Sequence, residues 1–284
     1  MPAQPASPRV EEQTAQIAGG PVFWRSAVGS GSPVLYLHGV PDSSDLWPAY
    51  LARTGGLAPD LPGFGRSGKR ADGDYTIDGY RAFLEAFLEH LGVERYRLVV
   101  HDWGAVGLAL AQRDPERLER LVMFNSVPLL PGYRWHRLAR VWRTPVVGEL
   151  AMGATTRWVL RQLSRGANVR PGSLPDDMIE SIWATFDQGT QRAILRLYRS
   201  SPPEVLAAAG ARLGELTAPA LVLWGAQDPY IPTRFAHAYA ERLPNARLGL
   251  VEAAGHWPWV DEPGLIGEAC TFLGEVDGGA AGDR

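Results

Sequence analysis

The stretch from Leu98 to Gln112 restricts the possible folds of this chain more than any other stretch. It begins with β-branched residues that favour a strand and continues from Gly104 with small residues that favour a closely packed helix. The backbone must turn sharply between the two, and Asp102 lies at the turn. A helix N-terminus offers free N–H groups and the positive end of a dipole, and both favour an anion. An isolated aspartate here would be an N-cap. The loops described below indicate instead a carboxylate nucleophile, which attacks carbon and leaves an ester for water to cleave.

Composition excludes several classes of protein. The 284 residues carry 28 basic and 31 acidic side chains, a formal charge of −3, and the arginines are scattered, so neither nucleic acid nor an anionic membrane is expected as a partner. No apolar run approaches the ~20 residues that span a bilayer, and residues 1–16 lack the apolar segment of a signal peptide. Cys270 is the only cysteine, which fits a reducing compartment. We therefore expect a cytoplasmic protein.

The order of segments predicts an α/β fold. Short apolar strands alternate with helices, which indicates a mostly parallel sheet covered on both faces. In the middle of the chain the strand signals vanish and helical segments follow one another, separated by prolines, at 134–142, 146–165, 175–186, 189–200 and 203–212. We predict an α/β core from residues 17–126 and 214–274, an inserted helical cap from 127–213, and disordered tails at 1–16 and 275–284.

Reactive residues follow four of the predicted strands. They lie in the loops at His38–Pro41, Asp102-Trp103, Asp228 and His256. The carboxyl ends of parallel strands meet at one edge of a sheet, so these loops are expected to come together. In the first loop, a glycine and a proline leave the Val40 N–H as an inward donor.

Each of these residues also has a structural interpretation. Asp228 precedes a proline and could be a turn residue, and His256 could be an ordinary loop histidine. For both we favour a functional role, because the chain order of nucleophile, acid and histidine matches one fold. His38 and His101 are expected to be structural; strand alternation turns the His101 side chain away from the nucleophile.

The motif His-Asp-Trp-Gly around Asp102 and this order resemble the α/β-hydrolase superfamily over residues 20–273, near its epoxide hydrolases and haloalkane dehalogenases. The resemblance implies that Asp102 attacks a substrate carbon and that His256 activates the water that cleaves the ester. Asp228 would orient the histidine and stabilise its cation. The backbone N–H groups of Val40 and Trp103 would stabilise the oxyanion. No cofactor or metal is implied.

The two families differ in the leaving group. A halide needs N–H donors; Trp103 could supply one, but many dehalogenases carry an asparagine where Val40 stands. An epoxide oxygen needs a proton donor, and Tyr198 matches the Tyr-Arg pattern late in the epoxide-hydrolase cap, 30 residues before Asp228 (228 − 198). Tyr133 is the only other cap tyrosine and is expected to bind substrate. Valine at position 100 is more typical of dehalogenases.

We therefore predict an epoxide hydrolase that acts on a small apolar substrate with water, as a monomer or homodimer. The alternatives are a haloalkane dehalogenase that uses the same ester and a ligand-binding relative without activity. The aspartate at the turn disfavours a serine esterase. An arginine after the nucleophile would favour fluoroacetate-type defluorination. This chain has Trp103 at that position, which disfavours that reaction.

Overall fold

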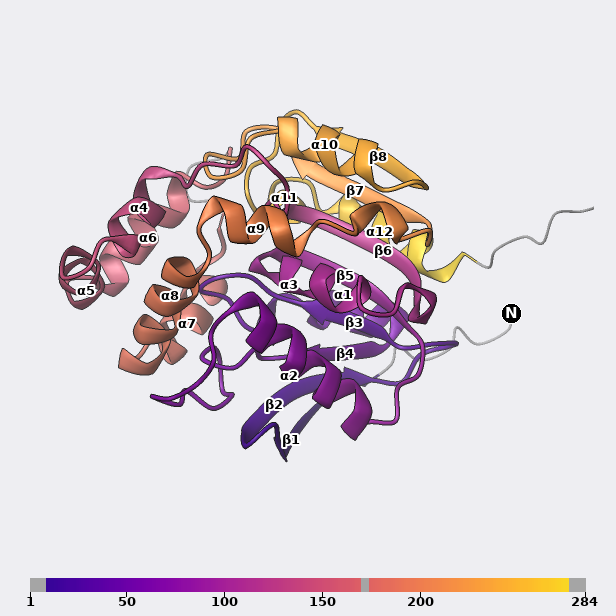
Figure 1. Ribbon diagram of the computed structural model, residues 1–284, viewed down its shortest axis with the longest axis horizontal. Helices are drawn as coiled ribbons and strands as arrows, with labels where there is room; N and C mark the ends of the chain where they lie inside the picture. Colours follow the sequence, from indigo (N-terminus) through magenta and orange to yellow (C-terminus); the bar gives the residue numbers. More distant parts are fainter. Residues whose placement is uncertain (1–8, 170–173, 276–284) are drawn as a thin grey trace, which may run out of the picture.

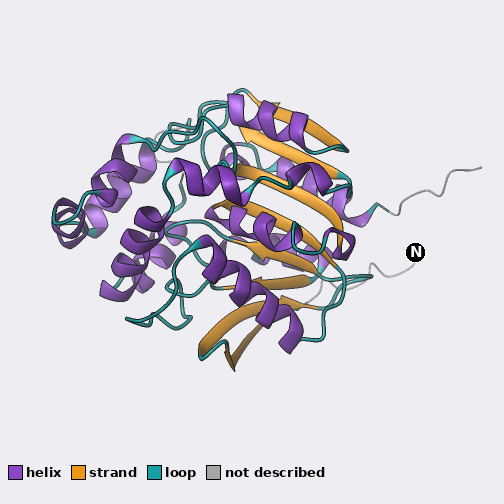
Figure 2. Cartoon of the chain, in the orientation of Figure 1, coloured by secondary structure: helices purple, strands orange, loops and turns teal. Residues whose placement is uncertain are grey.

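The computed structural model describes residues 9–169 and 174–275, which contain an eight-stranded sheet in the order β1-β2-β4-β3-β5-β6-β7-β8. β2 pairs antiparallel with β1 and with β4, and the remaining neighbours are parallel. The mostly parallel α/β fold is therefore confirmed (Figure 2). The strands are β1 (Glu11–Ile17), β2 (Gly20–Ala27), β3 (Val34–Leu37), β4 (Gly56–Pro59), β5 (Tyr96–Asp102), β6 (Leu118–Ser126), β7 (Ala220–Gly225) and β8 (Ala246–Val251).

Helices cover both faces of the sheet, because the central strands are apolar on both sides. All seven residues of β5 are buried. Leu98 and Val100 face the apolar layer under α2 and α3, whereas Val99 faces the layer under α1 and α12. Burying such a side chain stabilises the fold by roughly 1.5–3 kcal/mol. The helices of the two layers are α1 (Pro48–Thr54), α2 (Ile77–His90), α3 (Val106–Ala111), α10 (Arg234–Arg242), α11 (Pro258–Asp261) and α12 (Gly264–Gly274).

A helical insert (residues 127–219) connects β6 to β7. Figure 1 shows α4 to α8 grouped together to the left of the sheet. The predicted helix over 146–165 is wrong as a single helix, because it divides into two around Thr156. The Thr156 hydroxyl caps the second helix by accepting a hydrogen bond from the Val159 N–H at 3.3 Å. The helices of the insert are α4 (Arg137–Arg143), α5 (Val147–Gly153), α6 (Arg157–Arg165), α7 (Asp176–Thr185), α8 (Gln188–Ser200) and α9 (Pro203–Ala209).

The predicted N-terminal tail, residues 1–16, is wrong from residue 11 onward. Residues Glu11–Ile17 form β1, an edge strand that pairs along its whole length with β2. Its sequence is mostly polar because most of these side chains face solvent, while Ala15 and Ile17 pack against the core. The hydrolase core therefore begins before residue 17. The rest of the predicted tails, at residues 1–8 and 276–284, lies outside the described residues.

Within residues 9–169 and 174–275, no helix is both long and apolar enough to cross a membrane.

Candidate active site

Asp102 lies at the end of β5 in a backbone conformation that residues other than glycine rarely adopt, with φ 49° and ψ −119°. The chain enters a 3₁₀ turn at Trp103 directly afterwards. The Val127 N–H donates to the Asp102 carbonyl at 2.9 Å and holds the turn in place. Gly104 is required, because a Cβ there would lie 2.2 Å from the Leu37 carbonyl oxygen. The strained turn directs the Asp102 side chain out of the sheet.

The Asp102 carboxylate is held by the loop after β3. Its Oδ1 accepts a hydrogen bond from the Val40 N–H at 2.9 Å. Gly39 lets the two segments approach, since a Cβ there would lie 2.4 Å from the Asp102 Cβ. Burial raises the pKa of Asp102, while His256 and the N–H groups of Val40 and Trp103 act in the opposite direction. The ionised form that the sequence leads us to expect is therefore favoured by these contacts and opposed by burial.

His256 lies between two carboxylates. Its Nδ1 is 2.8 Å from Asp228 Oδ2, and its Nε2 is 3.7 Å from Asp102 Oδ2. Burial acts to lower the pKa of His256, but the Asp228 and Asp102 carboxylates outweigh it and raise the pKa to about 9. The three residues named from their strand-end loops are therefore brought together at one edge of the sheet.

The loop that carries Asp228 is fixed by hydrogen bonds to both carboxylate oxygens. Oδ1 accepts from the N–H groups of Tyr230 at 2.7 Å and Ile231 at 3.1 Å. Oδ2 accepts from the Asn125 side chain at 2.7 Å, and the Asn125 Oδ1 in turn accepts from the Gly225 N–H at 2.9 Å. The sequence analysis missed Asn125. Its signal in the sequence is a polar residue directly after the apolar run Leu121–Phe124.

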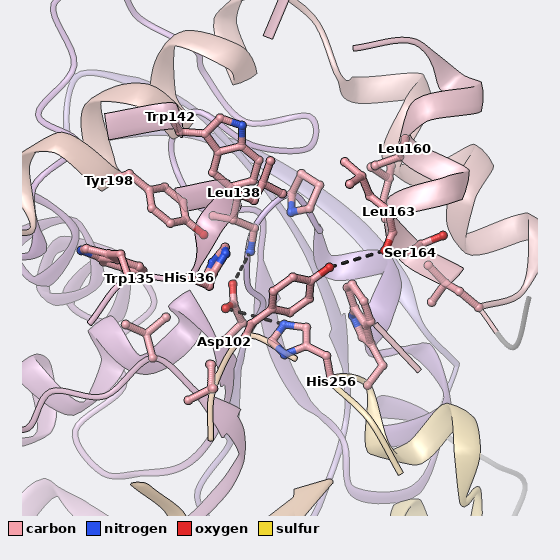
Figure 3. Close-up of a pocket in the computed structure, with 18 of the residues that line it drawn as sticks. Asp102, Trp135, His136, Leu138, Trp142, Leu160, Leu163, Ser164, Tyr198 and His256 are labelled. Carbon is pink, nitrogen blue, oxygen red and sulfur yellow. Dashed lines mark hydrogen bonds and ion pairs between the residues drawn. The ribbon is translucent and has the colours of Figure 1, made fainter. Parts of the chain in front are cut away.

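A narrow cavity of about 80 Å³ opens above the carboxylate (Figure 3). Its wall is mostly apolar, and the core and the insert both contribute to it. Core residues in the wall include Val40, Pro41, Asp102, Tyr230, Ile231, His256 and Trp257; insert residues include Val127, Tyr133, Trp135, His136, Leu138, Trp142, Leu160, Leu163, Ser164, Leu174, Ile182 and Tyr198.

Both predicted tyrosines reach this cavity. Tyr198, on α8, packs with its ring centroid 5.2 Å from that of Trp103, and Figure 3 shows its hydroxyl directed toward Asp102. Burial raises the pKa of Tyr198 well above its usual value. The Asp102 charge adds to this effect, and the Trp103 indole N–H opposes it. The hydroxyl of Tyr133 is buried and has no hydrogen-bond partner within the described residues. Burial raises its pKa as well.

The indole groups near the nucleophile do not form a pair of donors facing the cavity. Trp103 stacks on Trp135 at 5.4 Å and is not one of the residues that line the cavity. The Trp135 Nε1 donates to the Ser201 carbonyl at 3.0 Å and is therefore occupied. The Trp103 Nε1 has no partner that meets hydrogen-bond geometry in the described chain.

The two histidines expected to be structural are confirmed in that role. His38 is fully buried, its Nε2 accepts from the Leu61 N–H at 2.9 Å, and its Nδ1 lies 2.7 Å from the Gly39 carbonyl oxygen. The His101 Nε2 lies 2.9 Å from the His256 carbonyl oxygen. His101 therefore supports the backbone of the histidine loop.

The arrangement is suited to covalent chemistry on carbon. A held carboxylate faces an imidazole that is backed by a second carboxylate, next to an apolar cavity. Such a set can form an ester and then deliver water to it. In the part of the chain that the structure covers, no group of three His, Cys, Asp or Glu side chains could hold a metal ion.

Comparison with known proteins agrees with this geometry. A family profile described as the alpha/beta hydrolase fold matches residues 32–150. A haloalkane dehalogenase of Mesorhizobium japonicum is 30% identical over 97% of this chain and 95% of its own. A 2-hydroxymuconate semialdehyde hydrolase of Pseudomonas sp. strain CF600 is 30% identical over 89% of this chain and 90% of its own. The structure of the epoxide hydrolase CorEH superimposes with a TM-score of 0.80 at 23% identity, covering 93% of this chain and 99% of the other, which shows the shared fold.

Fold and site together define a hydrolase-fold protein with an aspartate at the nucleophile position. The chain belongs to the α/β-hydrolase superfamily, and its relatives at 30% identity include a haloalkane dehalogenase and a 2-hydroxymuconate semialdehyde hydrolase.

Proposed function

We propose that the protein is an epoxide hydrolase that opens a small apolar epoxide to a diol. In the first step, Asp102 Oδ2 attacks a ring carbon, because Oδ1 is held by the Val40 N–H. A carbon–oxygen bond to the carboxylate forms while the ring carbon–oxygen bond breaks and leaves an alkoxide. The product is an ester on Asp102 with a hydroxyl on the neighbouring carbon.

Tyr198 supplies the proton for the alkoxide. Its raised pKa keeps the hydroxyl protonated before the reaction, and part of that shift comes from the negative charge on Asp102. Ester formation neutralises Asp102 and removes this contribution. The hydroxyl therefore becomes more acidic as the alkoxide appears, which is the timing that general acid catalysis needs.

His256 activates the water that cleaves the ester. Water loses a proton to Nε2 and attacks the ester carbonyl, and Asp228 stabilises the resulting imidazolium. The former Oδ1 takes up negative charge, which the Val40 and Trp103 N–H groups stabilise. Collapse of this intermediate breaks the Cγ–Oδ2 bond of Asp102, and Oδ2 leaves with the substrate and takes the proton from the His256 imidazolium, which completes the diol. The water oxygen stays in the carboxylate of Asp102, and its remaining proton returns to the Tyr198 phenolate. Tyr133 contributes to the wall that binds the apolar part of the substrate.

One observation supports an epoxide over a halide. The Tyr198 hydroxyl shares the cavity with Asp102, whereas the indole N–H groups of Trp103 and Trp135 do not present two donors to that cavity. Of these two indoles, at most one could solvate a leaving halide, whereas a leaving alkoxide has the Tyr198 hydroxyl as its proton donor.

A haloalkane dehalogenase is the second candidate. The 30% identity to the dehalogenase of Mesorhizobium japonicum across 97% of this chain favours it, and so does the unpartnered Trp103 Nε1 beside the nucleophile. The ester on Asp102 and its hydrolysis would be the same, with halide as the leaving group.

The test uses two substrates with the same carbon skeleton, 1,2-epoxybutane and 1-bromobutane. We expect diol from the epoxide, no bromide from the haloalkane, and neither product from the Asp102→Ala variant. Tyr198→Phe should reduce diol formation by about 10²-fold or more. Bromide without diol would replace the proposal by the dehalogenase, and binding without turnover of either class would indicate a ligand-binding relative.

A further inference from the structure

Most of the exposed apolar side chains lie in one part of the insert. Of the eight large apolar side chains that are exposed in the described residues, six lie between residues 141 and 163. We call these six the apolar patch: Val141, Val146, Val147, Leu150, Trp158 and Leu163. They belong to α4, α5, α6 and the turn before α5, and Figure 1 shows these helices together at one end of the molecule, with α5 outermost. Such a concentration of exposed apolar side chains is typical of a surface that binds a partner.

The helix α5 directs its larger apolar side chains away from the protein. Gly148 and Met152, four residues apart, are buried on its inner face, whereas Leu150 is 69% exposed. Val146, at the start of the helix, is also 69% exposed and has φ 68°, a conformation that a β-branched residue rarely adopts. Packing within the described residues therefore accounts for neither Val146 nor Leu150.

The helix α6 has one face toward the cavity and another toward solvent. Its Leu160 is buried and lines the same cavity as Asp102. Trp158 is 68% exposed and shares the outer face with Arg165, seven residues further on. An indole suits the boundary between lipid and water, because its ring is apolar and its N–H is polar.

The same part of the insert is strongly basic. Residues 134–165 contain seven arginines and one carboxylate, Glu149, which is a net charge of +6 in a chain whose total is −3, so the rest of the chain carries −9 (−3 − 6). Four of these arginines are exposed and have neither an ion pair nor a side-chain hydrogen bond within the described residues: Arg134, Arg137, Arg140 and Arg165. The negative charge of the whole chain, which argued against an anionic membrane as a partner, therefore conceals a basic region.

We propose that the apolar patch and the arginines beside it form a surface that binds the headgroup region of an anionic lipid bilayer. The apolar side chains enter the boundary of the acyl chains, and the arginines bind lipid phosphate groups. A surface of this kind lies on the bilayer and needs no helix that spans it. Leu163 belongs to the apolar patch and also lines the cavity, so an apolar molecule that leaves the lipid would meet the cavity wall there.

A second copy of this chain fits the apolar patch less well than a lipid surface. In a symmetric dimer the same face of each copy meets the other, so two regions of charge +6 would be brought together. Like charges at close range oppose such a contact, whereas anionic headgroups attract both.

The test measures co-sedimentation of the full chain with lipid vesicles. One set is phosphatidylcholine alone, and the other is an equal mixture of phosphatidylcholine and phosphatidylglycerol. Leu150→Ser with Trp158→Ser shortens two exposed apolar side chains and leaves the charge unchanged. Arg140→Glu with Arg165→Glu reverses two exposed charges and leaves the apolar patch intact.

Matched controls change the opposite edge of the sheet in the same way. Val28 is 86% exposed and follows β2, whose last residue pairs with the first residue of β4. Val28→Ser is the control for the apolar pair. Arg9, which lies before β1, and Arg113, which lies before β6, are exposed arginines, so Arg9→Glu with Arg113→Glu is the control for the charge pair.

We expect the wild type to sediment with the mixed vesicles and to remain in solution with phosphatidylcholine alone. Loss of one arginine near anionic lipid weakens binding roughly fivefold, so the Arg140→Glu, Arg165→Glu variant should bind at least about 20-fold more weakly. The Leu150→Ser, Trp158→Ser variant should bind at least about 10-fold more weakly, with an unchanged melting temperature because both side chains are exposed. Both control variants should bind like the wild type. Raising the salt concentration from about 0.1 M to about 1 M shortens the Debye length from about 10 Å to about 3 Å and should release the protein.

Three results would overturn the proposal. The first is a wild type that sediments with neither kind of vesicle, and the second is equal binding by the wild type and the Leu150→Ser, Trp158→Ser variant. The third is a loss in the Arg9→Glu, Arg113→Glu control as large as in the Arg140→Glu, Arg165→Glu variant, which would indicate attraction without a defined surface. A dimer in sedimentation velocity that this apolar substitution abolishes, without vesicle binding, would assign the apolar patch to a contact between two copies instead. Because the test measures binding, it stands whether or not the proposed epoxide chemistry is correct.

Discussion

At the scale of single residues, ester formation and ester hydrolysis can be separated experimentally, because only hydrolysis needs His256. His256 Nε2 lies 3.7 Å from Asp102 Oδ2 and is placed to serve the water step, whereas attack on carbon needs only the carboxylate. His256→Gln should therefore form the ester but hydrolyse it about 10²–10⁴-fold more slowly. Intact-mass measurement after substrate addition should show a protein heavier by one substrate molecule, mapped to Asp102 by peptide digestion. Multiple turnover at the wild-type rate would contradict the role given to His256.

Asn125 is a second residue whose role can be isolated. Its side chain donates to Asp228 at 2.7 Å and accepts from Gly225 at 2.9 Å, and its backbone has φ +30°. The Asn125 side chain also donates to the Gly225 carbonyl at 3.2 Å. Asn125→Gly keeps that backbone conformation accessible and removes all three hydrogen bonds. We expect a loss of about 1–3 kcal/mol in the free energy of unfolding and slower hydrolysis of the ester. Asn125→Ala should lose more stability than the glycine variant, because alanine resists positive φ. The reverse order in urea titrations would show that backbone strain is unimportant here.

At the scale of secondary-structure elements, regular patterns made the fold predictable from the sequence. The strand–turn–helix around Asp102 followed from a β-branched run next to small residues. The helix α2, Ile77–His90, is likewise indicated by the sequence, because its apolar residues recur at helical spacing. β1 was missed because an edge strand whose side chains mostly face solvent has little apolar alternation.

Contacts between residues that are far apart in the sequence could not be predicted from local sequence patterns. Asn125 acts through Asp228 and Gly225, which approach it only in the folded chain. Its place directly after an apolar run marks the end of a strand, but its partners could not be predicted from the sequence. The triad residues were found because their loops follow strands in a recognisable order. The order of these loops along the chain predicts which loops come together. It does not predict which other side chains line the same cavity.

One junction joins the insert to the histidine loop. The His256 N–H donates to the Ala167 carbonyl at 2.7 Å. Asp261 Oδ2 accepts from the Gly255 N–H at 2.9 Å and from the Asn168 side chain at 3.0 Å. This buried carboxylate therefore holds the histidine loop and the insert together.

Substitutions at this junction should disturb the catalytic histidine from a distance. Asp261→Asn replaces an acceptor by a group that also carries donors, so the Gly255 N–H and the Asn168 amide lose part of their hydrogen bonding. We expect a lower melting temperature, a loss of about 1–3 kcal/mol, and a reduced kcat with little change in the alkylation rate. Asn168→Ala removes a single hydrogen-bonding side chain and should have a smaller effect. Wild-type stability and kcat in Asp261→Asn would contradict this coupling.

At the scale of the whole molecule, buried ionisable groups of the site make the stability of the fold depend on pH. Asp42 is buried beside the active site, and its Oδ2 accepts from the Trp257 indole N–H at 3.2 Å. Burial and the nearby Asp102 raise the pKa of Asp42 from 3.8 to about 7. The folded protein therefore holds a proton that the unfolded chain has already released, and stability falls as pH rises from about 4 to 7.

His256 adds to this loss at higher pH. Its folded pKa is raised from 6.5 to about 9 by the neighbouring carboxylates, against the effect of burial. The stability that its charged form contributes is fully present below pH 6.5 and is lost as pH rises through about 9. Both groups thus favour the folded state in mildly acidic solution, so the free energy of unfolding should decline across neutral and alkaline pH.

Asp42→Asn separates the two contributions. Asparagine can still accept from the Trp257 indole but has no proton to lose, so the decline between pH 4 and 7 should be weaker in the variant. Since the pKa shift runs from 3.8 to about 7, the variant should exceed the wild type at pH 8 by up to ~4 kcal/mol. Urea titrations at pH 5 and pH 8 measure this difference.

Asp45→Asn is the matched control, because the pKa of Asp45 is shifted in the opposite direction to that of Asp42. The pKa of Asp45 is lowered overall, with burial acting to raise it but outweighed by the Ser181 hydroxyl and by Arg25, so this variant should be less stable than the wild type at pH 8. If Asp42→Asn is as stable as the wild type at both pH values, ionisation of the Asp42 carboxyl does not destabilise the folded state, and the pH dependence must come from other groups such as His256.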